Sequence, residues 1–304
     1  MPSIAPIALF AYARPEHTRR TLEALAANAL ADQSDLIVYA DAARGERNAE
    51  AVCAVRELIR SASGFRSVTL VKRDMNFGLA RNIIEGVSEV LHQHDRVIVL
   101  EDDMVTSPFF LTYMNDALKR YANDDRIISI HGYVYPVAAA LPEAFFLPGA
   151  DCWGWATWRR GWACFNPDGV QLLRELKQRK LERTFDYEGS YPYTKMLEAQ
   201  IAGTNDSWAI RWYASAFLLG KLTLYPGRSL VHNIGNDATG THCDQSSEMD
   251  TLLSDRPIRL DGVAVESSTL ARGEFARFFS RQSRRGITGW IRRVLGSLTT
   301  ERAA

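Results

Sequence analysis

The stretch VIVLEDD, residues 97–103, decides the fold class, because an uninterrupted apolar run ends abruptly in three acidic residues. Continuous apolar character without alternation is typical of a parallel strand that helices cover on both faces. In an open parallel sheet, ligands bind beyond the carboxyl ends of the strands. The stretch therefore predicts a buried strand that carries Glu101, Asp102 and Asp103 to a ligand-binding edge.

A unit of strand, turn and amphipathic helix repeats through the first 135 residues. Strands are expected at Ile4–Tyr12, Leu36–Ala40, Val68–Val71 and Val97–Leu100, about thirty residues apart, which is the spacing of βαβ units. Between them, an apolar stripe from Leu79 to Leu91 is typical of a helix. The pattern predicts an α/β fold, a Rossmann-like and mostly parallel sheet flanked by helices.

The remainder of the chain has a different residue pattern, without the regular repeat of strand and helix. Tryptophans crowd between residues 153 and 162, in an irregular region. A charged helix is expected over Leu172–Arg183 and an apolar one over Ile210–Leu219. Residues 226–250 are rich in Gly, Asn, Asp and Ser, so we expect a loop there.

The composition argues against several classes of protein. Thirty-six Lys and Arg balance thirty-six Asp and Glu in 304 residues, so no net charge supports nucleic-acid binding. Four cysteines without a CxxC pair favour neither a disulfide framework nor a zinc site, and they indicate a reducing compartment. No apolar run is long enough to span a bilayer, and the apolar start of the chain lacks the flanks of a signal peptide. Neither GxGxxG after the first strand nor GxxxxGK[ST] occurs, so neither a dinucleotide site nor a P-loop is supported.

The acidic triplet predicts a divalent cation. Adjacent carboxylates raise one another's pKa unless a cation or hydrogen-bond donors offset their charge. Magnesium and manganese prefer oxygen ligands and are commonly held by one or two carboxylates together with substrate phosphates. The expected cofactor is therefore Mn²⁺ or Mg²⁺, and the expected substrate carries a diphosphate. The alternative is that the acids face water or cap the helix expected near Ser107.

Several segments, in one order along the chain, carry a resemblance to a known family. They are AYARP at 11–15, YAD at 39–41, VIVLEDDMVTSPFF at 97–110, FFLPG at 145–149 with WGW at 153–155, and NDSW at 205–208. Together they resemble N-acetylglucosaminyltransferase I and its relatives, which are inverting, metal-dependent glycosyltransferases of the GT-A fold. The segment NFGLARN at 76–82 is closer to the family 2 glycosyltransferases. The membrane anchor of the animal enzyme is missing, so the chain looks like a soluble bacterial relative.

The resemblance implies how the acidic triplet would hold a donor. Asp103 would bind the metal, Asp102 would face the ribose or the water around the metal, and Glu101 would face the donor sugar. His232 could complete the metal shell, as a late histidine does in some enzymes of this fold. Its alternative is a structural histidine.

Three further residues would contact the nucleotide. By resemblance, Arg14 lies at the nucleotide, Asp41 accepts from a uracil ring, and Arg81 contacts phosphate or base. Each of the last two has a plain alternative: Arg81 could pair with Glu85, and Asp41 could cap the helix expected near Glu46.

The acceptor side is expected at Trp153, Gly154 and Trp155, because aromatic rings commonly line ligand sites. Trp158 and Trp162 are interpreted as core.

Inversion requires a base on the face opposite the leaving group, and one carboxylate suffices. Asp206 is the predicted base, because the NDSW segment resembles the one that carries the base in the family. Its alternative is a helix cap. Asp151, Asp186 and Glu188 are the reserve candidates.

The end of the chain is basic. Residues Gly273–Leu298 contain six arginines and one glutamate, and apolar residues from Ile287 to Leu298 follow helical spacing. An arginine-faced amphipathic helix suits an anionic membrane surface, although it could equally dock on the core.

The predicted organisation is a nucleotide-sugar-binding half (1–135), an acceptor-binding and catalytic half (136–270) and a basic tail (271–304). The predicted function is an inverting, metal-dependent glycosyltransferase that moves a sugar from a nucleotide sugar, UDP-linked in expectation, to a glycan or lipid-linked acceptor in surface polysaccharide biosynthesis. A cytoplasmic location, peripheral to the inner face of a bacterial plasma membrane, follows as an expectation. The alternatives are a sugar nucleotidyltransferase and a catalytically silent, membrane-associated binding module.

Overall fold

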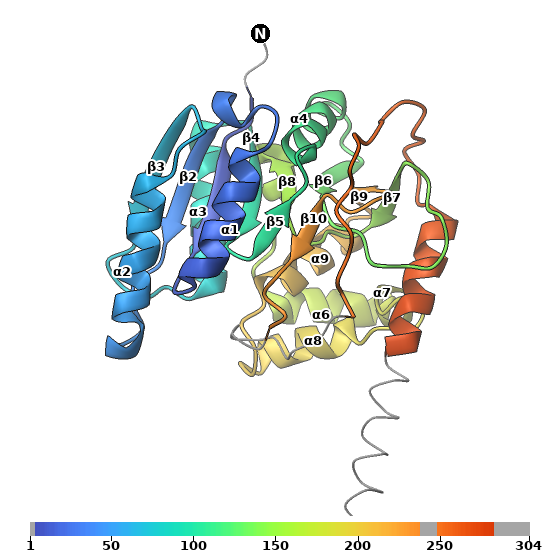
Figure 1. The fold of residues 1–304 in the computed structure, drawn as a ribbon. Coiled ribbons are helices and arrows are strands. Elements are labelled where there is room, and N and C mark those ends of the chain that lie inside the picture. Colours follow the sequence, from blue (N-terminus) through green and yellow to red (C-terminus); the bar gives the residue numbers. More distant parts are fainter. Residues whose placement is uncertain (1–3, 238–247, 283–304) are drawn as a thin grey trace, which may run out of the picture.

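The computed structural model describes residues 4–237 and 248–282, which build an eight-stranded sheet between two layers of helices (Figure 1). The strand order is β3-β2-β1-β4-β8-β6-β9-β7. The strands are β1 (Ile7–Ala11), β2 (Asp35–Ala40), β3 (Ser67–Lys72), β4 (Arg96–Glu101), β6 (Ile127–His131), β7 (Ala144–Pro148), β8 (Trp155–Trp158) and β9 (Leu222–Pro226).

Most strands run in one direction. β3, β2, β1 and β4 pair in parallel, and β6 pairs in parallel with β9. The reversed strands are β8, which lies between β4 and β6, and β7 at the far edge. The predicted α/β fold class, a mostly parallel sheet flanked by helices, is confirmed. The four strands expected in the first 135 residues are all present, each within a few residues of its predicted bounds.

Both faces of the sheet are buried, as the apolar runs predicted. In β1, Ile7 and Leu9 join the core beneath one helical layer, whereas Ala8 and Phe10 join the core beneath the other. The first layer contains α1 (Pro15–Ala26), α2 (Glu46–Ser61) and α4 (Phe110–Arg120). The second contains α3 (Leu79–Gln93), α5 (Arg159–Trp162) and α9 (Trp208–Leu218). In Figure 1, α1 and α2 lie in front of the sheet and α3 lies behind it.

Two expectations about local structure need correction. The charged helix expected over Leu172–Arg183 is two helices, α6 (Gly169–Gln178) and α7 (Glu182–Phe185), because Lys180 between them has a left-handed backbone with φ 55°. The region expected to be loop contains a strand, β10 (Val231–Asn233), which pairs antiparallel with β5 (Met104–Thr106). The partner of β10 lies more than a hundred residues away, so local composition carried no signal for it.

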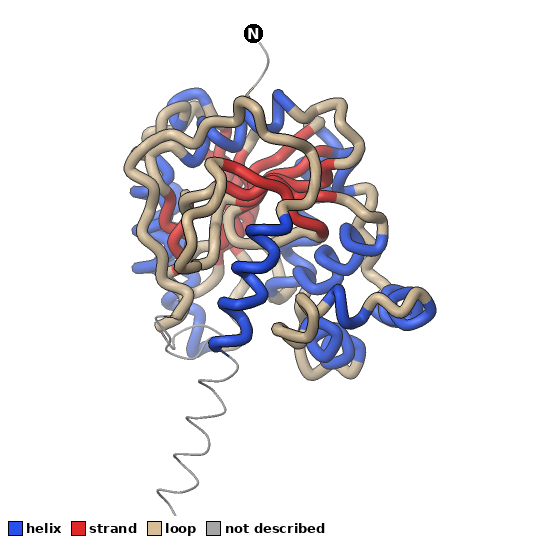
Figure 2. The backbone as a smooth tube through the Cα atoms, turned by 90° about the vertical axis from the view of Figure 1, so that its right-hand side faces the viewer, coloured by secondary structure: helices blue, strands red, loops and turns tan. Residues whose placement is uncertain are grey.

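The remaining elements build the second half. They are α8 (Tyr193–Ile201) and a helix over 269–282, whereas the short helix η1 (Ala31–Gln33) lies between α1 and β2 in the first half. That last helix lies on the β7 side of the sheet (Figures 1 and 2), and its Phe275 and Phe279 are 0% and 1% exposed. The first part of the basic tail therefore docks on the core. The apolar set from Ile287 to Leu298, predicted to face a membrane, lies outside the described residues.

The predicted halves share the sheet, because β6 from the first half lies between β8 and β9 of the second. Among the described residues, no helix is both long enough and apolar enough to traverse a bilayer.

Candidate active site

The predicted acidic triplet lies at the carboxyl edge of the parallel strands. Glu101 ends β4, and Asp102 and Asp103 form the turn before β5; we call residues 101–103 the acidic turn. Asp102 and Asp103 are only 4% and 7% exposed. The backbone N–H of Tyr12 donates to Asp102 Oδ2 at 3.2 Å, and the Thr21 hydroxyl donates to the Asp102 carbonyl at 2.9 Å. The ends of β1 and β4 and the helix α1 therefore fix the turn.

Arg14 connects the two aspartates. Its Nη2 donates to Asp102 Oδ1 and to Asp103 Oδ2, each at 2.7 Å. Burial disfavours the charge of Arg14, but the two carboxylates outweigh that penalty and raise its pKa. Burial, together with the charges of Asp103 and Asp102, raises the pKa of Glu101 to about 8. One guanidinium is thus set against three acids, and the turn holds more negative potential than Arg14 balances.

The structure supports a cation at Asp103. Its Oδ1 is buried and has no hydrogen-bond partner among the described residues. Buried carboxylate oxygens are normally paired, so an orphaned one calls for a ligand. An oxygen of this kind suits Mn²⁺ or Mg²⁺. Within the described residues, no group of three or more His, Cys, Asp or Glu is arranged to hold a metal ion by itself.

The segment that contains the predicted His232 lies beside the acidic turn, as a strand that the sequence analysis did not predict. The backbone N–H of Ile234 donates to the Asp103 carbonyl at 2.9 Å, which continues the β5–β10 pairing. A Cβ added to Gly235 would overlap Asp103 Oδ2 and lie 3.1 Å from Arg14 Nη1. His232 is on the same strand, opposite Val105, and its Nδ1 faces the Thr251 N–H at 3.5 Å. The sequence signals for this segment are His232 itself and a glycine among polar residues.

Asp41 connects two loops at the same edge. Its Oδ1 accepts from the backbone N–H groups of Phe77 and Ala42 at 2.8 and 2.9 Å, and its Oδ2 accepts from Gly78 at 2.9 Å. Because Gly78 is the N-cap of α3, Asp41 holds the start of α3 rather than that of α2. The expected alternative for Arg81 is observed: its Nε donates to Glu85 at 2.7 Å.

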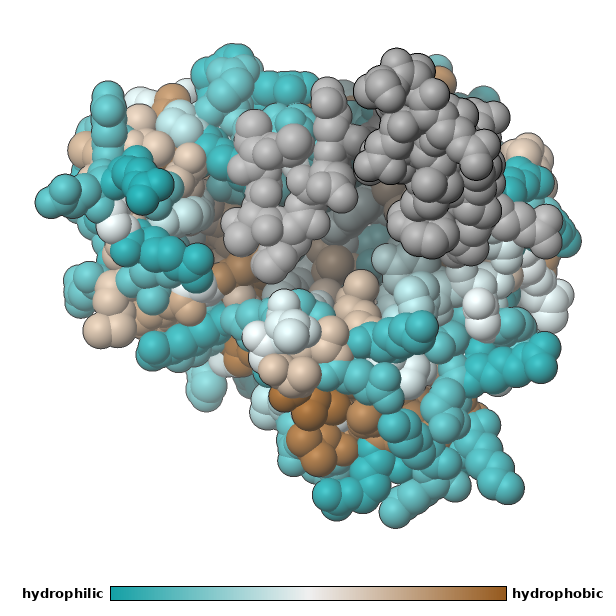
Figure 3. Space-filling model, turned by 90° about the horizontal axis from the view of Figure 1, so that it is seen from below, coloured by the Kyte–Doolittle hydropathy of each residue, from teal (hydrophilic) through white to brown (hydrophobic). Residues whose placement is uncertain are grey.

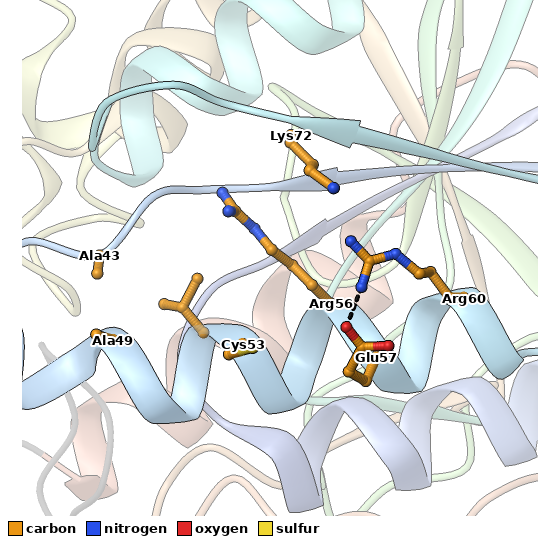
Figure 4. A pocket seen from close by; sticks show the side chains of 8 residues that line it. Ala43, Ala49, Cys53, Arg56, Glu57, Arg60 and Lys72 are labelled. Atoms are coloured by element: carbon orange, nitrogen blue, oxygen red, sulfur yellow. Dashed lines mark hydrogen bonds and ion pairs between the residues drawn. The ribbon is translucent and has the colours of Figure 1, made fainter.

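A surface cavity of about 290 Å³ between α2 and β3 contains none of the predicted site residues (Figure 4). Arg56, Arg60 and Lys72 converge on it, and Glu57 pairs with Arg60. Arg56 Nη2 donates to the carbonyls of Asp41 and Arg73 at 3.3 and 3.1 Å. Arg56 therefore supports the loops that follow β2 and β3.

The tryptophans divide between surface and core. Trp153 is half-buried, and its ring lies 4.7 Å from that of Tyr133. Trp155 is 1% exposed and packs among Trp162, Trp208 and Trp212, so its ring has no free face for a sugar. Gly154 between them is buried and adopts φ 63°. Trp158 and Trp162 are core, as expected.

The candidate bases have different surroundings. Asp206 is 71% exposed at the start of α9 and lies 3.7 Å from Arg211, while Ser207 caps the helix. Asp186 accepts from the Thr194 N–H and hydroxyl at 2.7 and 2.8 Å. Glu188 lies 3.6 Å from two arginines, Arg183 and Arg272.

Asp151 differs from these acids. Its side chain is 22% exposed, and its Oδ2 accepts from the Tyr135 hydroxyl at 3.2 Å. The pKa of the Cys152 thiol is raised well above its usual value, first by burial and then by the charges of Asp151, Glu101 and Asp103. Cys152 therefore lies within electrostatic reach of both Asp151 and the acidic turn.

Comparison with known proteins assigns no activity. No protein-family model matches the chain, and no curated protein matches it. The crystal structure titled S. aureus TarS 1-349 aligns at 10% identity and a TM-score of 0.41, covering 76% of this chain and 61% of that one. The chain thus spans less than two thirds of that structure. A functional conclusion depends on the residues of the chain itself.

Proposed function

We propose that this chain is an inverting, metal-dependent glycosyltransferase that moves a sugar from a nucleotide sugar, UDP-linked in our proposal, to a glycan or lipid-linked acceptor. The observation that carries the proposal is Asp103 Oδ1, a buried oxygen for which residues 4–237 and 248–282 supply no hydrogen-bond partner, in a turn whose acids outnumber their arginine. At the carboxyl edge of parallel strands, such an oxygen suits a cation that also binds phosphate oxygens.

Each group of the acidic turn has a role in this proposal. Asp103 would hold Mn²⁺ or Mg²⁺, with His232 of the neighbouring strand as a further ligand. When bound, the cation would supply positive charge for the diphosphate that leaves. Arg14 would then be less tied to the carboxylates, so its planar donor fork could bind a phosphate oxygen. Asp102 would face the ribose and Glu101 the donor sugar.

The nucleotide base would lie near the end of β2. Asp41 Oδ2 accepts only one of the three hydrogen bonds made to this carboxylate, which leaves it able to accept the N3–H of uracil. Arg81 is 54% exposed, and its guanidinium lies 3.8 Å from the ring centre of Phe77. This exposed, cationic position supports Arg81 as a contact to base or phosphate.

The acceptor side requires a carboxylate that removes a proton from the attacking hydroxyl. Trp153, which is half-buried and packs against Tyr133, would offer its ring to a sugar. Asp206 is the base predicted from the sequence, and Asp151 is its structural competitor.

Binding of UDP tests the proposal most directly. We expect titration calorimetry to detect UDP binding that requires Mn²⁺, and we expect Asp103→Asn to weaken it by about 100-fold, because the cation loses its ligand. The matched control is Asp125→Asn, since Asp125 is 86% exposed and remote from the turn. Unchanged UDP affinity in Asp103→Asn would exclude the proposed metal site.

Product analysis separates the alternatives. A glycosyltransferase releases UDP from a UDP-sugar, whereas a sugar nucleotidyltransferase releases pyrophosphate from UTP and a sugar 1-phosphate. A silent binding module binds UDP and releases neither product.

The acceptor class extends the proposal to a membrane. We propose that the arginines of Gly273–Leu298 attach the protein to the inner face of a bacterial plasma membrane, where lipid-linked acceptors for surface polysaccharide are found. A chain ending at Gln282 should lose sedimentation with anionic vesicles and keep its binding of UDP. Equal sedimentation of the two chains contradicts attachment through the tail.

A further inference from the structure

Asp151 is a carboxylate without a cationic partner near the acidic turn. Among the described residues, no Lys or Arg lies within ion-pair distance of it, whereas Asp206, Glu188, Asp102 and Asp103 all have an arginine. An arginine lowers the basicity of a carboxylate and occupies its lone pairs. Asp151 therefore keeps lone pairs that no cation of the described residues occupies.

The groups around Asp151 hold it in place without neutralising it. The Tyr135 hydroxyl donates to Oδ2, and the backbone N–H of Cys152 donates to Oδ1 at 2.9 Å. His131 Nε2 lies 3.7 Å from Oδ2, and the imidazole is fully buried with neither nitrogen hydrogen-bonded among the described residues. Burial lowers the pKa of His131, so the ring is neutral at neutral pH.

The pairing of β8 with β4 brings Asp151 to the sheet edge that carries the acidic turn. β8 runs antiparallel to β4, with Trp155 opposite Val99, so the residues that precede β8 lie alongside the end of β4. Asp151 and Cys152 are therefore at the same sheet edge as the acidic turn. The combined effect of Asp151, Glu101 and Asp103 on the Cys152 thiol supports this placement.

Aromatic rings continue away from Asp151 and suit a carbohydrate acceptor. Successive rings lie 4.4–5.3 Å apart along one path, which we call the aromatic track: Trp153, Tyr133, Tyr135, Phe279, Tyr191 and Tyr193. Trp153, Tyr135, Tyr191 and Tyr193 keep part of their surface accessible. Figure 3 shows the molecule from below the view of Figure 1, with hydrophilic residues over much of this face and smaller groups of hydrophobic residues between them. Such rings provide flat apolar surface for the C–H faces of sugars.

We propose that Asp151, rather than Asp206, is the general base, and that the acceptor glycan lies along the aromatic track. This inference rests on the proposed function. The acceptor O–H bond breaks and its proton goes to the Asp151 carboxylate. The acceptor oxygen forms a bond to the anomeric carbon of the donor, and the bond from that carbon to the diphosphate breaks, so its electron pair leaves with the nucleoside diphosphate. Tyr135 is a positioning residue, because its hydroxyl holds the carboxylate.

The experiment measures transfer from a panel of UDP-sugars to p-nitrophenyl glycosides, with Mn²⁺-dependent UDP binding measured in parallel. Asp151→Asn should lower kcat by at least about 100-fold, the usual loss of a general base, and leave UDP binding unchanged. Asp206→Asn should lower kcat less than Asp151→Asn. Asp125→Asn is the control for loss of an exposed acid.

A variant that keeps the fold tests the positioning role. Tyr135→Phe removes only the hydroxyl that donates to Asp151, so kcat should fall by about tenfold while the KM for the UDP-sugar stays unchanged. An effect on KM alone would assign Tyr135 to binding and contradict the positioning role.

The outcomes separate this inference from the proposed function. Near-normal turnover in Asp151→Asn, or a larger loss in Asp206→Asn, overturns the assignment of the base and leaves the transferase intact. A wild-type chain that neither binds UDP nor transfers sugar overturns both.

Discussion

The acidic turn and the Asp151 region present carboxylates at one edge of one sheet, yet they are stabilised in opposite ways. At the acidic turn, Arg14 donates hydrogen bonds to two aspartates, and one oxygen of Asp103 has no partner in the part of the chain that the structure describes. Around Asp151, neutral donors replace the arginine, namely the Tyr135 hydroxyl and the Cys152 N–H. The difference teaches that charge compensation, more than residue type, separates a carboxylate suited to hold a cation from one suited to take a proton.

The largest effect on stability is expected at Trp155, a tryptophan whose side chain is fully buried. Trp155→Ala should lower the free energy of unfolding by about 4 kcal/mol, because it empties a fully buried site among three tryptophans. Trp153→Ala should cost less stability and should raise the KM for a p-nitrophenyl glycoside acceptor. Urea unfolding and acceptor kinetics measure the two effects. Equal stability losses in both variants would contradict the division between core and acceptor surface.

The stability of the acidic turn should depend on Arg14, which pairs with both of its aspartates. Arg14→Ala should destabilise the fold by about 3 kcal/mol, because Asp102 and Asp103 would be buried without their cationic partner. Mn²⁺ should then raise the melting temperature of this variant more than that of wild type.

The matched control for Arg14 is Arg19→Ala. Arg19 is 44% exposed and pairs with Glu16 and Glu23 on α1, so its loss should cost less than about 0.5 kcal/mol. If thermal unfolding shows the same loss of stability for Arg14→Ala and Arg19→Ala, the charges of Asp102 and Asp103 do not depend on Arg14 as described above.

The close approach of residue 235 provides a smaller test. Gly235→Ala places a methyl group against Asp103 and Arg14, and it should weaken Mn²⁺-dependent UDP binding by about tenfold, or 1.4 kcal/mol. Gly45→Ala is the control, since open space surrounds that position and φ is −177°. Calorimetry that finds equal UDP affinity in both variants would show that residue 235 does not shape the site.

The partly exposed ion pair of Arg228 and Glu143 provides a reference for the stability contribution of the buried pairs. Arg228 hydrogen-bonds both oxygens of Glu143 at 2.9 Å and lowers its pKa from 4.5 to about 2. Because the folded-state pKa is the lower one, the pair stabilises the fold fully above pH 4.5 and loses that contribution as the pH falls towards 2. Glu143→Gln should cost about 1 kcal/mol at pH 7, since Glu143 is 40% exposed, and nearly nothing at pH 2. If urea unfolding shows the same stability difference between wild type and Glu143→Gln from pH 7 to pH 2, the ion pair is not the source of that difference.

Much of the fold was predictable because its signals are local. Apolar runs located the first four strands, and apolar stripes located α3 and α9. The acidic turn was predictable for the same reason, since three acids follow directly on the most apolar strand. The strand β10 was missed, because its three residues become a strand only by pairing with β5.

Side-chain surroundings were less predictable. Trp153 and Trp155 are two residues apart in sequence, yet one is half-buried and the other is enclosed by helices α5 and α9. Asp41 was expected to cap α2 or to accept a hydrogen bond from a uracil ring. In the structure, its carboxylate accepts from the backbone N–H groups of Phe77 and Gly78, which are 36 and 37 residues further along the chain.

By itself, the sequence determined the layered α/β architecture and the position of three acids at a strand end, because hydrophobic periodicity and motif spacing are properties of neighbouring residues. Only the tertiary structure decided which acids have an arginine and which do not. Arg14 meets Asp102 across 88 residues, and Asp151 meets Tyr135 and His131, because the strand order brings β1 beside β4 and β8 beside β6. Charge compensation depends on distances in space, so it becomes visible only once the chain is folded.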